Sequence, residues 1–197
     1  MTTMKWNIPN ILTLLRIILI PVFVLVFYAP YEWSNLLSTA IFGLAAVTDW
    51  LDGYFARRLK QSSVFGAFLD PVADKLMVAV ALVVLVQDNP TMLFTIPAAI
   101  IVGREIVISA LREWMSEIGA RTRVAVSVIG KIKTAAQMIA ILLLLYNHPL
   151  GAFPTHDVGL LLIYVAATLT LWSMVVYLRA AWPILMGKPA SNPRDDA

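Results

Sequence analysis

Asp49-Trp-Leu-Asp52-Gly53-Tyr-Phe-Ala56-Arg57 and, eight residues later, Gly66-x-x-x-Asp70-x-x-x-Asp74 form the stretch of sequence that decides the fold. Each half holds two aspartates three or four residues apart, and this spacing places both on one face of a helix. Both halves adjoin long apolar runs. Because carboxylates in or near a bilayer are costly and are kept for function, four of them predict a bound metal.

The composition indicates a membrane protein. Hydrophobic residues make up 60% of the 197 residues and charged residues only 14%, against roughly 45–50% and about 25% in soluble domains. Six apolar stretches approach the roughly 20 residues that a helix needs to cross a bilayer. They are Ile11–Tyr28, Asn35–Leu51, Pro71–Val86, Met92–Leu111, Val126–Tyr146 and Val158–Leu178. We therefore predict an all-α, polytopic membrane protein with six transmembrane helices in one domain over residues 1–186, and a polar, disordered tail over residues 187–197.

Lysine and arginine residues predict the orientation. The three loops that would lie outside hold neither residue, whereas Arg57, Arg58 and Arg121 fall in the loops on the other side. Since positively charged loops stay in the cytoplasm, we expect both termini to be cytoplasmic. A cleaved signal peptide is the alternative for the first stretch, but Arg16 interrupts its apolar run and no small-x-small cleavage site follows near Tyr28.

This topology places all four acids at the cytoplasmic interface. The second helix runs inward, so Asp49 and Asp52 are expected in its last turn. The third helix runs outward, with Asp70 and Asp74 near its start. Pro71 is tolerated there, because the first helical turn has N–H groups without intrahelical partners. Two antiparallel helix ends would then present two pairs of carboxylates to one space.

The ligand chemistry favours a hard cation. The chain has no cysteine, which excludes thiolate ligands, and an all-oxygen carboxylate set suits Mg²⁺ or Mn²⁺. Four acids exceed what one Mg²⁺ usually takes from protein, so we expect two ions that share carboxylates and bind a diphosphate. Gly53 and Ala56 would let a nucleotide approach the helix, and Arg57 is placed to hold a phosphate.

The alternative reading of the acids is structural: they cap helices, or pair with Lys75, Arg57 and Arg58. A single aspartate at a helix end is often a cap. We disfavour this explanation for four together, because unpaired acids are rarely retained at membrane depth.

The gapped pattern Asp-x-x-Asp-Gly-x-x-Ala-Arg-x8-Gly-x3-Asp-x3-Asp resembles the signature of the CDP-alcohol phosphotransferase family, and the chain matches it at every fixed position. The similarity extends to about Arg179. Its further segments are Asn7-Ile-Pro-Asn10-Ile-Leu-Thr13-Leu-Leu-Arg16, Ala46-Val-Thr-Asp-Trp-Leu-Asp-Gly, Phe65-Gly-Ala-Phe-Leu-Asp-Pro-Val-Ala-Asp-Lys75 and Arg104-Glu-Ile-Val-Ile-Ser-Ala-Leu-Arg-Glu-Trp114. Together they are most similar to the bacterial members that make phosphatidylglycerophosphate.

The resemblance implies a reaction and its residues. The sn-1 hydroxyl of glycerol 3-phosphate would attack the β-phosphorus of CDP-diacylglycerol, giving phosphatidylglycerophosphate and CMP. Asp49, Asp52, Asp70 and Asp74 would bind two divalent ions, and Asp74 would also be the general base. CDP-diacylglycerol would contact Asn10, Thr13, Arg16, Asp49, Gly53, Ala56, Arg57 and Gly66. The resemblance further implies a homodimer in the bacterial cytoplasmic membrane, with membrane lipids but no nucleic acid as partners and the active site at the cytoplasmic face.

The phosphate of the acceptor needs cations of its own. Arg112, Lys131 and Lys133 fall near inner helix ends, at the expected depth of the aspartates, and we assign them to this phosphate. Ordinary positive charge flanking a membrane span is the alternative. Arg104 lies about 12 Å deeper than Arg112, at 1.5 Å per residue. It is either a further ligand of this phosphate or a member of an internal ion pair with Glu105 or another acid.

Two other functions stay open. The metal motif serves only the CDP half of the donor, so serine, an inositol phosphate or phosphatidylglycerol could replace glycerol 3-phosphate as the acceptor. Only the long match through the fourth and fifth helices favours glycerol 3-phosphate. A small ion or metal transporter is the second, but transporter sites lie near the midplane between repeated halves. Here the acids cluster at one interface and no repeat is visible.

Overall fold

The computed structural model of the protein describes residues 8–59, 64–118 and 128–186, and within these ranges the chain is all-α. The helices are α1 (Ile8–Phe27), α2 (Ser34–Leu59), α3 (Val64–Asp88), α4 (Met92–Glu117), α5 (Val128–Tyr146) and α6 (Thr155–Leu185). Each predicted apolar stretch falls mainly on one of them, so the all-helical prediction is confirmed for the described residues. The predicted tail over residues 187–197 lies outside them.

The predicted end of the second helix is wrong. We expected Asp49 and Asp52 in its last turn, but α2 continues to Leu59. The apolar run ends at Leu51, yet helical hydrogen bonds need no apolar side chains, and arginine and leucine are good helix formers. The two aspartates therefore lie within α2, before its last turn.

The predicted start of the third helix is also wrong. α3 begins at Val64, so Pro71 lies inside the helix and Asp70 is well past its first turn. A proline inside a helix removes one backbone hydrogen bond and crowds the preceding turn. Such prolines are tolerated in membrane helices, because neighbouring groups satisfy the freed carbonyl. Asp70 and Asp74 are consequently held by regular helix on both sides.

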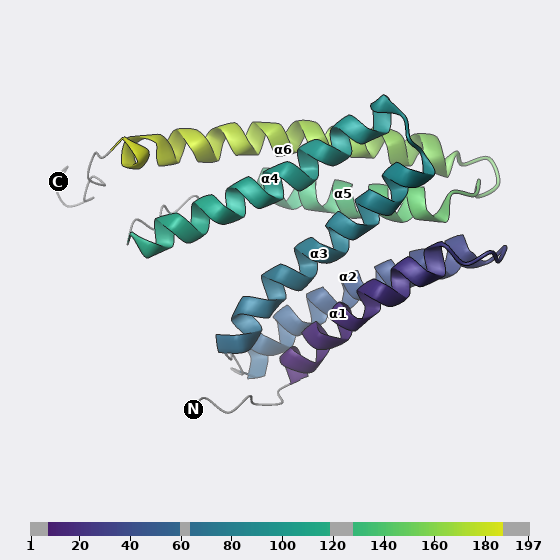
Figure 1. Ribbon diagram of the computed structural model, residues 1–197, viewed down its shortest axis with the longest axis horizontal. Coiled ribbons are helices and arrows are strands. Elements are labelled where there is room, and N and C mark those ends of the chain that lie inside the picture. Colours follow the sequence, from purple (N-terminus) through teal and green to yellow (C-terminus); the bar gives the residue numbers. More distant parts are fainter. Residues whose placement is uncertain (1–7, 60–63, 119–127, 187–197) are drawn as a thin grey trace.

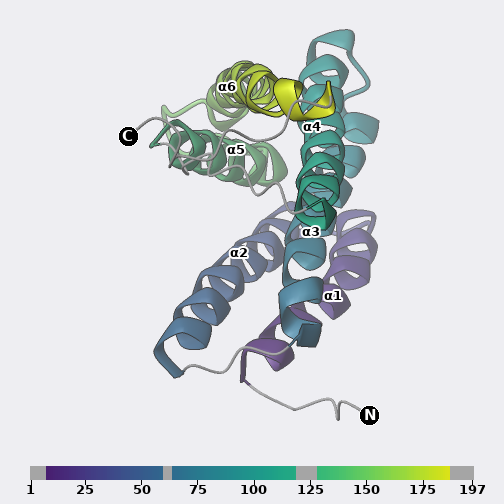
Figure 2. The same cartoon turned by 90° about the vertical axis from the view of Figure 1, so that its left-hand side faces the viewer.

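The six helices form two groups, with α3 crossing between them (Figure 1). α1 packs against α2 and α3, while α6 packs against α4 and α5, and α2 also contacts α5. Figure 2 shows the same division from the side, with α1 and α2 below and α5 and α6 above. The turns that join α1 to α2, α3 to α4 and α5 to α6 lie together at one end of the molecule, opposite the start of α1 and the end of α6 (Figure 1).

The core consists of apolar side chains between the helices, among them the fully buried Phe23, Phe42 and Ile141. Large apolar side chains also face outward, since Leu25 is 73% exposed and Leu161 is 64% exposed. An apolar exterior of this kind marks a surface that meets lipid or another protein. The molecule is therefore built with apolar residues inside and outside.

Three helices are long and apolar enough to cross a membrane by length and composition, in the part of the chain that the structure describes. They cover Asn10–Phe27, Met92–Glu117 and Thr155–Leu185. Ile132–Tyr146 is a shorter apolar helix. A membrane protein is thus supported, while six spans and cytoplasmic termini stay predictions.

Candidate active site

The centre of the candidate site is an arginine that joins three helices. Nη1 of Arg16 on α1 lies 2.9 Å from Oδ1 of Asp49 on α2 and 3.4 Å from Oδ1 of Asp70 on α3. Arg16 is 1% exposed, whereas each aspartate side chain is 41% exposed. One buried cation therefore gathers two carboxylates that remain open to solvent. The prediction that the acids of the second and third helices converge is confirmed for Asp49 and Asp70.

Asp74 lies on α3 one turn beyond Asp70 and belongs to the same group. It interacts electrostatically with Asp49, Asp70 and Arg16. With Arg16 and Phe42 it lines a small cavity of about 10 Å³. The side chain of Asp74 therefore lies where α1, α2 and α3 meet.

The predicted donor-binding residues of α1 lie on the face that carries Arg16. Asn10, Thr13 and Arg16 follow one another at intervals of three residues, and all three are buried. Gly66 is half-buried on α3. Polar side chains on the inward face of an otherwise apolar helix are expensive, which supports a function for them.

Four predicted residues of α2 cannot be placed by their side chains. The backbone of α2 is helical through Asp52, Gly53, Ala56 and Arg57, but their side chains lie outside the described residues. Among the side chains that are described, no three of His, Cys, Asp or Glu lie close enough together to hold a metal ion. The full set of four acids therefore remains a prediction.

The donor set nevertheless fits a divalent cation. Asp49 and Asp70 offer carboxylate oxygens from two helices within 3.4 Å of one positively charged nitrogen. Carboxylate oxygens are the ligands that Mg²⁺ and Mn²⁺ prefer. The guanidinium of Arg16 already lies beside both acids. Each acid also keeps solvent-exposed surface that could contact a metal ion.

A second charged cluster connects α4, α5 and α6. Oε1 of Glu105 accepts hydrogen bonds from Nη1 of Arg104 at 2.9 Å and from Nζ of Lys133 at 3.0 Å. Nη2 of Arg104 donates to Oγ of Ser173 at 3.3 Å, and its guanidinium lies 5.7 Å from the ring centre of Tyr177. Of the two alternatives for Arg104, the internal ion pair is present, with Glu105 as its partner.

Two of the three residues assigned to the acceptor phosphate, Lys133 and Arg112, have described side chains. Lys133 is 6% exposed, so it is not an ordinary solvated flanking charge. Arg112 is exposed on α4, where its Nε donates to the backbone oxygen of Ile108. The side chain of Lys131 lies outside the described residues.

The turn of α4 after Glu105 also reaches α3, and sequence reasoning missed this contact. Nζ of Lys75 donates to Oγ of Ser109, and that hydroxyl donates in turn to the backbone oxygen of Glu105 at 2.6 Å. Lys75 directly follows Asp74. The available signal was a pair of polar residues, Glu105 and Ser109, four apart on one face of an apolar helix.

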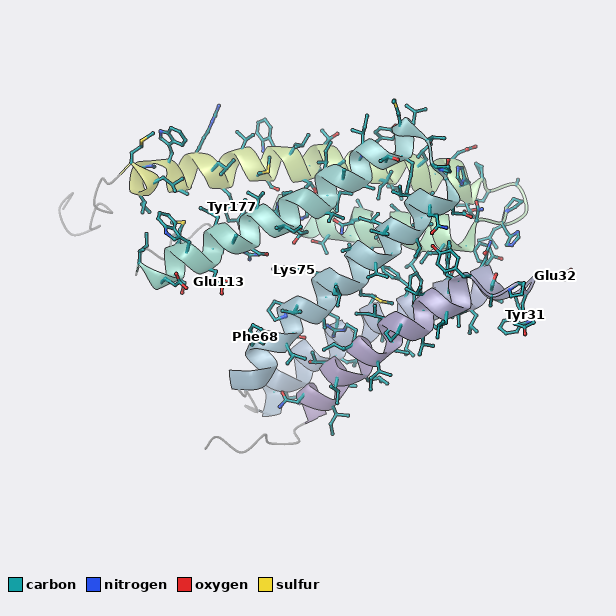
Figure 3. All side chains as sticks on the ribbon, in the orientation of Figure 1. Tyr31, Glu32, Phe68, Lys75, Glu113 and Tyr177 are labelled. Atoms are coloured by element: carbon teal, nitrogen blue, oxygen red, sulfur yellow. The ribbon has the colours of Figure 1, made fainter. Side chains whose placement is uncertain are left out.

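A groove of about 760 Å³ opens between α3 and α4 beside this contact. Its walls are mainly apolar, and Lys75, Glu105, Ser109, Arg112 and Glu113 supply its polar lining. Figure 3 shows Phe68 and Lys75 of α3 and Glu113 of α4 on the side where the two helices diverge. The groove thus brings an apolar surface next to charged groups that adjoin the aspartates.

The chain is similar to known proteins along most of its length. Residues 6–176 match the family model described as CDP-alcohol phosphatidyltransferase. A CDP-diacylglycerol–glycerol-3-phosphate 3-phosphatidyltransferase of Pseudomonas fluorescens is 59% identical, over 91% of this chain and 92% of its own length. Proteins of the same name from Salmonella paratyphi A and Shigella flexneri serotype 5b are 54% and 56% identical, each over 90% of this chain and 96% of its own.

Proposed function

The chain belongs to the CDP-alcohol phosphatidyltransferase family, and we propose that it transfers the phosphatidyl group of CDP-diacylglycerol to the sn-1 hydroxyl of glycerol 3-phosphate. The products are phosphatidylglycerophosphate and CMP. Relatives that cover nearly the whole chain at 54–59% identity carry the name of this activity. The reaction is the first step committed to phosphatidylglycerol and its derivatives.

One observation supports this function most strongly: a single nitrogen of Arg16 lies within 3.4 Å of both Asp49 and Asp70. Acids from separate parts of the signature therefore meet at one point. Asp49, Asp52, Asp70 and Asp74 would hold two divalent ions, Mg²⁺ or Mn²⁺. Bound there, the ions would neutralise charge on the diphosphate and on the departing CMP.

The protein's own groups complete the chemistry. Asp74 accepts the proton of the sn-1 hydroxyl as its oxygen bonds to the β-phosphorus, and the bond from that phosphorus to CMP breaks. Arg16 and Arg57 bind phosphate oxygens of the donor, with Asn10 and Thr13 beside Arg16 on α1. Gly53, Ala56 and Gly66 leave room for the nucleotide. Substrates held in this geometry react as if within one molecule.

The acceptor is bound by its phosphate. Lys133 and Lys131 on α5 and Arg112 on α4 supply the positive charge, and Arg104 stays in the ion pair with Glu105. We place the enzyme in the bacterial cytoplasmic membrane as a homodimer with six spans. Its aspartates would face the cytoplasm, where the soluble acceptor and the lipid donor can meet.

The test is release of CMP by the purified protein in detergent. The assay contains CDP-diacylglycerol, Mg²⁺ and one acceptor at a time: glycerol 3-phosphate, serine, inositol phosphate or phosphatidylglycerol. We expect CMP with glycerol 3-phosphate alone, together with a lipid product that contains its phosphate. Release with another acceptor only would keep the chemistry and change the substrate. No release with any acceptor, from protein that binds CDP-diacylglycerol, would refute the enzyme.

A further inference from the structure

The two cations that meet at Glu105 share one oxygen atom. Arg104 and Lys133 both donate to Oε1 of Glu105, at 2.9 Å and 3.0 Å. Arg104 is the preceding residue on α4, whereas Lys133 reaches across from α5. Hydrogen bonds between charged partners are stronger and more directional than neutral ones. The carboxylate consequently fixes the position of an ammonium on a neighbouring helix.

Glu105 is itself held from several sides. Its cation partner Arg104 is anchored on α6 by Ser173. Its backbone oxygen accepts from Ser109, which receives a hydrogen bond from Lys75 on α3. The segment from residue 104 to residue 109 thus contacts α3, α5 and α6 together. A carboxylate anchored in this way has a defined position between α4 and α5.

Lysine depends on such support more than arginine does. Its ammonium is a compact charge on a flexible four-carbon stem. An ammonium has three N–H donors, and Glu105 takes one of those of Lys133. The hydrogen bond to one carboxylate fixes the direction of the buried ammonium, and within the described residues its other two N–H donors are left for a second anion.

We propose that Glu105 is a positioning residue that aims the ammonium of Lys133 at the phosphate of the acceptor. This inference rests on the proposed function and adds a specificity element to it. Glu105 offsets the charge of only one of its two cation partners. Arg104, Glu105 and Lys133 together therefore carry one net positive charge, which suits an anionic acceptor. Glu105 acts through Lys133 and touches neither substrate.

The first test compares Glu105→Gln with the wild type by CMP release at varied glycerol 3-phosphate and varied CDP-diacylglycerol. We expect KM for glycerol 3-phosphate to rise about tenfold, the order expected when a charge-assisted hydrogen bond is lost. KM for CDP-diacylglycerol should stay within about twofold, because the donor half of the site is untouched. Glu105→Asp keeps the charge and should recover part of the affinity. Equal rises in both KM values, or an unchanged KM for glycerol 3-phosphate, would overturn the proposal.

The second test is a double-mutant cycle with Lys133→Met. If Glu105 acts through Lys133, adding Glu105→Gln to Lys133→Met should change KM for glycerol 3-phosphate by less than about twofold. A further tenfold rise would show that Glu105 acts independently of Lys133 and would refute the inference. Glu117→Gln, exposed in the last turn of the same helix, is the matched control and should behave as wild type.

Two controls separate this inference from its premise. Removing one partner of a buried ion pair can destabilise a protein, so each variant is first checked for monodispersity and for protection against heat by CDP-diacylglycerol. If Glu105→Gln does not fold, the Glu105→Asp variant decides by the same ratio of KM values. Wild-type protein that releases no CMP with glycerol 3-phosphate would defeat the proposed function. If the wild type is active but the Glu105 variant raises both KM values equally, only the positioning role is refuted.

Discussion

Arg16 and Asp49 form an ion pair of 2.9 Å whose two members differ in their access to solvent. The arginine side chain is 1% exposed and the aspartate side chain is 41% exposed. Because a buried charge without a partner is far more costly than a solvated one, the arginine depends on the acid more than the acid depends on the arginine. Activity and stability should therefore respond differently to changes at the two positions.

Arg16→Met should keep the fold and lose most of the activity. Methionine fills much of the buried volume without a charge, and the two aspartates left without their partner are each 41% exposed, so they stay solvated and avoid the cost of a buried unpaired charge. Loss of a phosphate-binding donor should lower kcat/KM for CMP release by about 100-fold or more. Arg16→Lys keeps the charge but lacks the planar guanidinium, so its kcat/KM should lie between those of the wild type and Arg16→Met. Both are measured by CMP release and by thermal unfolding in detergent.

Arg179→Met is the matched control, because Arg179 is exposed on α6. It should retain wild-type kinetics. Near-normal turnover of Arg16→Met would remove Arg16 from the site and leave it a purely structural cation.

Asp74→Asn should abolish turnover while CDP-diacylglycerol still binds. The amide keeps the size of the side chain but cannot accept the proton of the attacking hydroxyl, and general bases typically contribute about 10²–10⁴-fold. CMP release measures the loss, and protection of the protein from heat by CDP-diacylglycerol measures binding. Asp88→Asn, exposed at the other end of the same helix, should be fully active. Substantial activity in Asp74→Asn would exclude Asp74 as the base.

The sequence predicts the acid site more completely than it predicts the contacts between helices. The spacing of Asp70 and Asp74 requires a shared helix face, and the apolar runs require membrane-like helices, so both follow from local pattern. The ends of α2 and α3 do not follow from local pattern. Hydropathy indicates which residues can lie within a bilayer, but not where the hydrogen bonds of the helix end. The contact of Lys133 with Glu105 joins helices whose relative rotation depends on packing. A pattern gives the face of each helix but not its partner.

Chelation of divalent metal should abolish CMP release, and added Mg²⁺ or Mn²⁺ should restore it. Carboxylate oxygens prefer these hard cations. Asp49→Asn removes one charged ligand and should raise the Mg²⁺ concentration for half-maximal activity at least about tenfold. Asp157→Asn, exposed at the start of α6, should leave that concentration unchanged. Full activity in the presence of excess chelator would contradict the proposed metal chemistry.

Gly159→Ala should destabilise the packing of α5 against α6. A Cβ atom at this position would lie 2.9 Å from Cγ of Leu144 and 3.2 Å from Cβ of Leu143. Overpacking of this kind costs about 1–3 kcal/mol, which corresponds to a fall in Tm of roughly 2–12 °C in a chain of this size. At Gly103 a Cβ meets nothing within 4 Å, so Gly103→Ala should unfold at the wild-type temperature or above it, since alanine favours helix. A Gly159→Ala protein as stable as Gly103→Ala would show that α5 and α6 are not in close contact there.

The orientation in the membrane can be tested with single cysteines, because the chain has none of its own. Glu32 is exposed at the turn between α1 and α2 (Figure 3), and Ser116 is exposed near the end of α4. With cytoplasmic termini, a membrane-impermeant maleimide should label Glu32→Cys in intact cells and Ser116→Cys only after lysis. The absence of lysine and arginine from the three outer loops is the physical reason. The reverse labelling pattern, in variants that still release CMP, would place the aspartates on the outer face and away from a cytoplasmic acceptor.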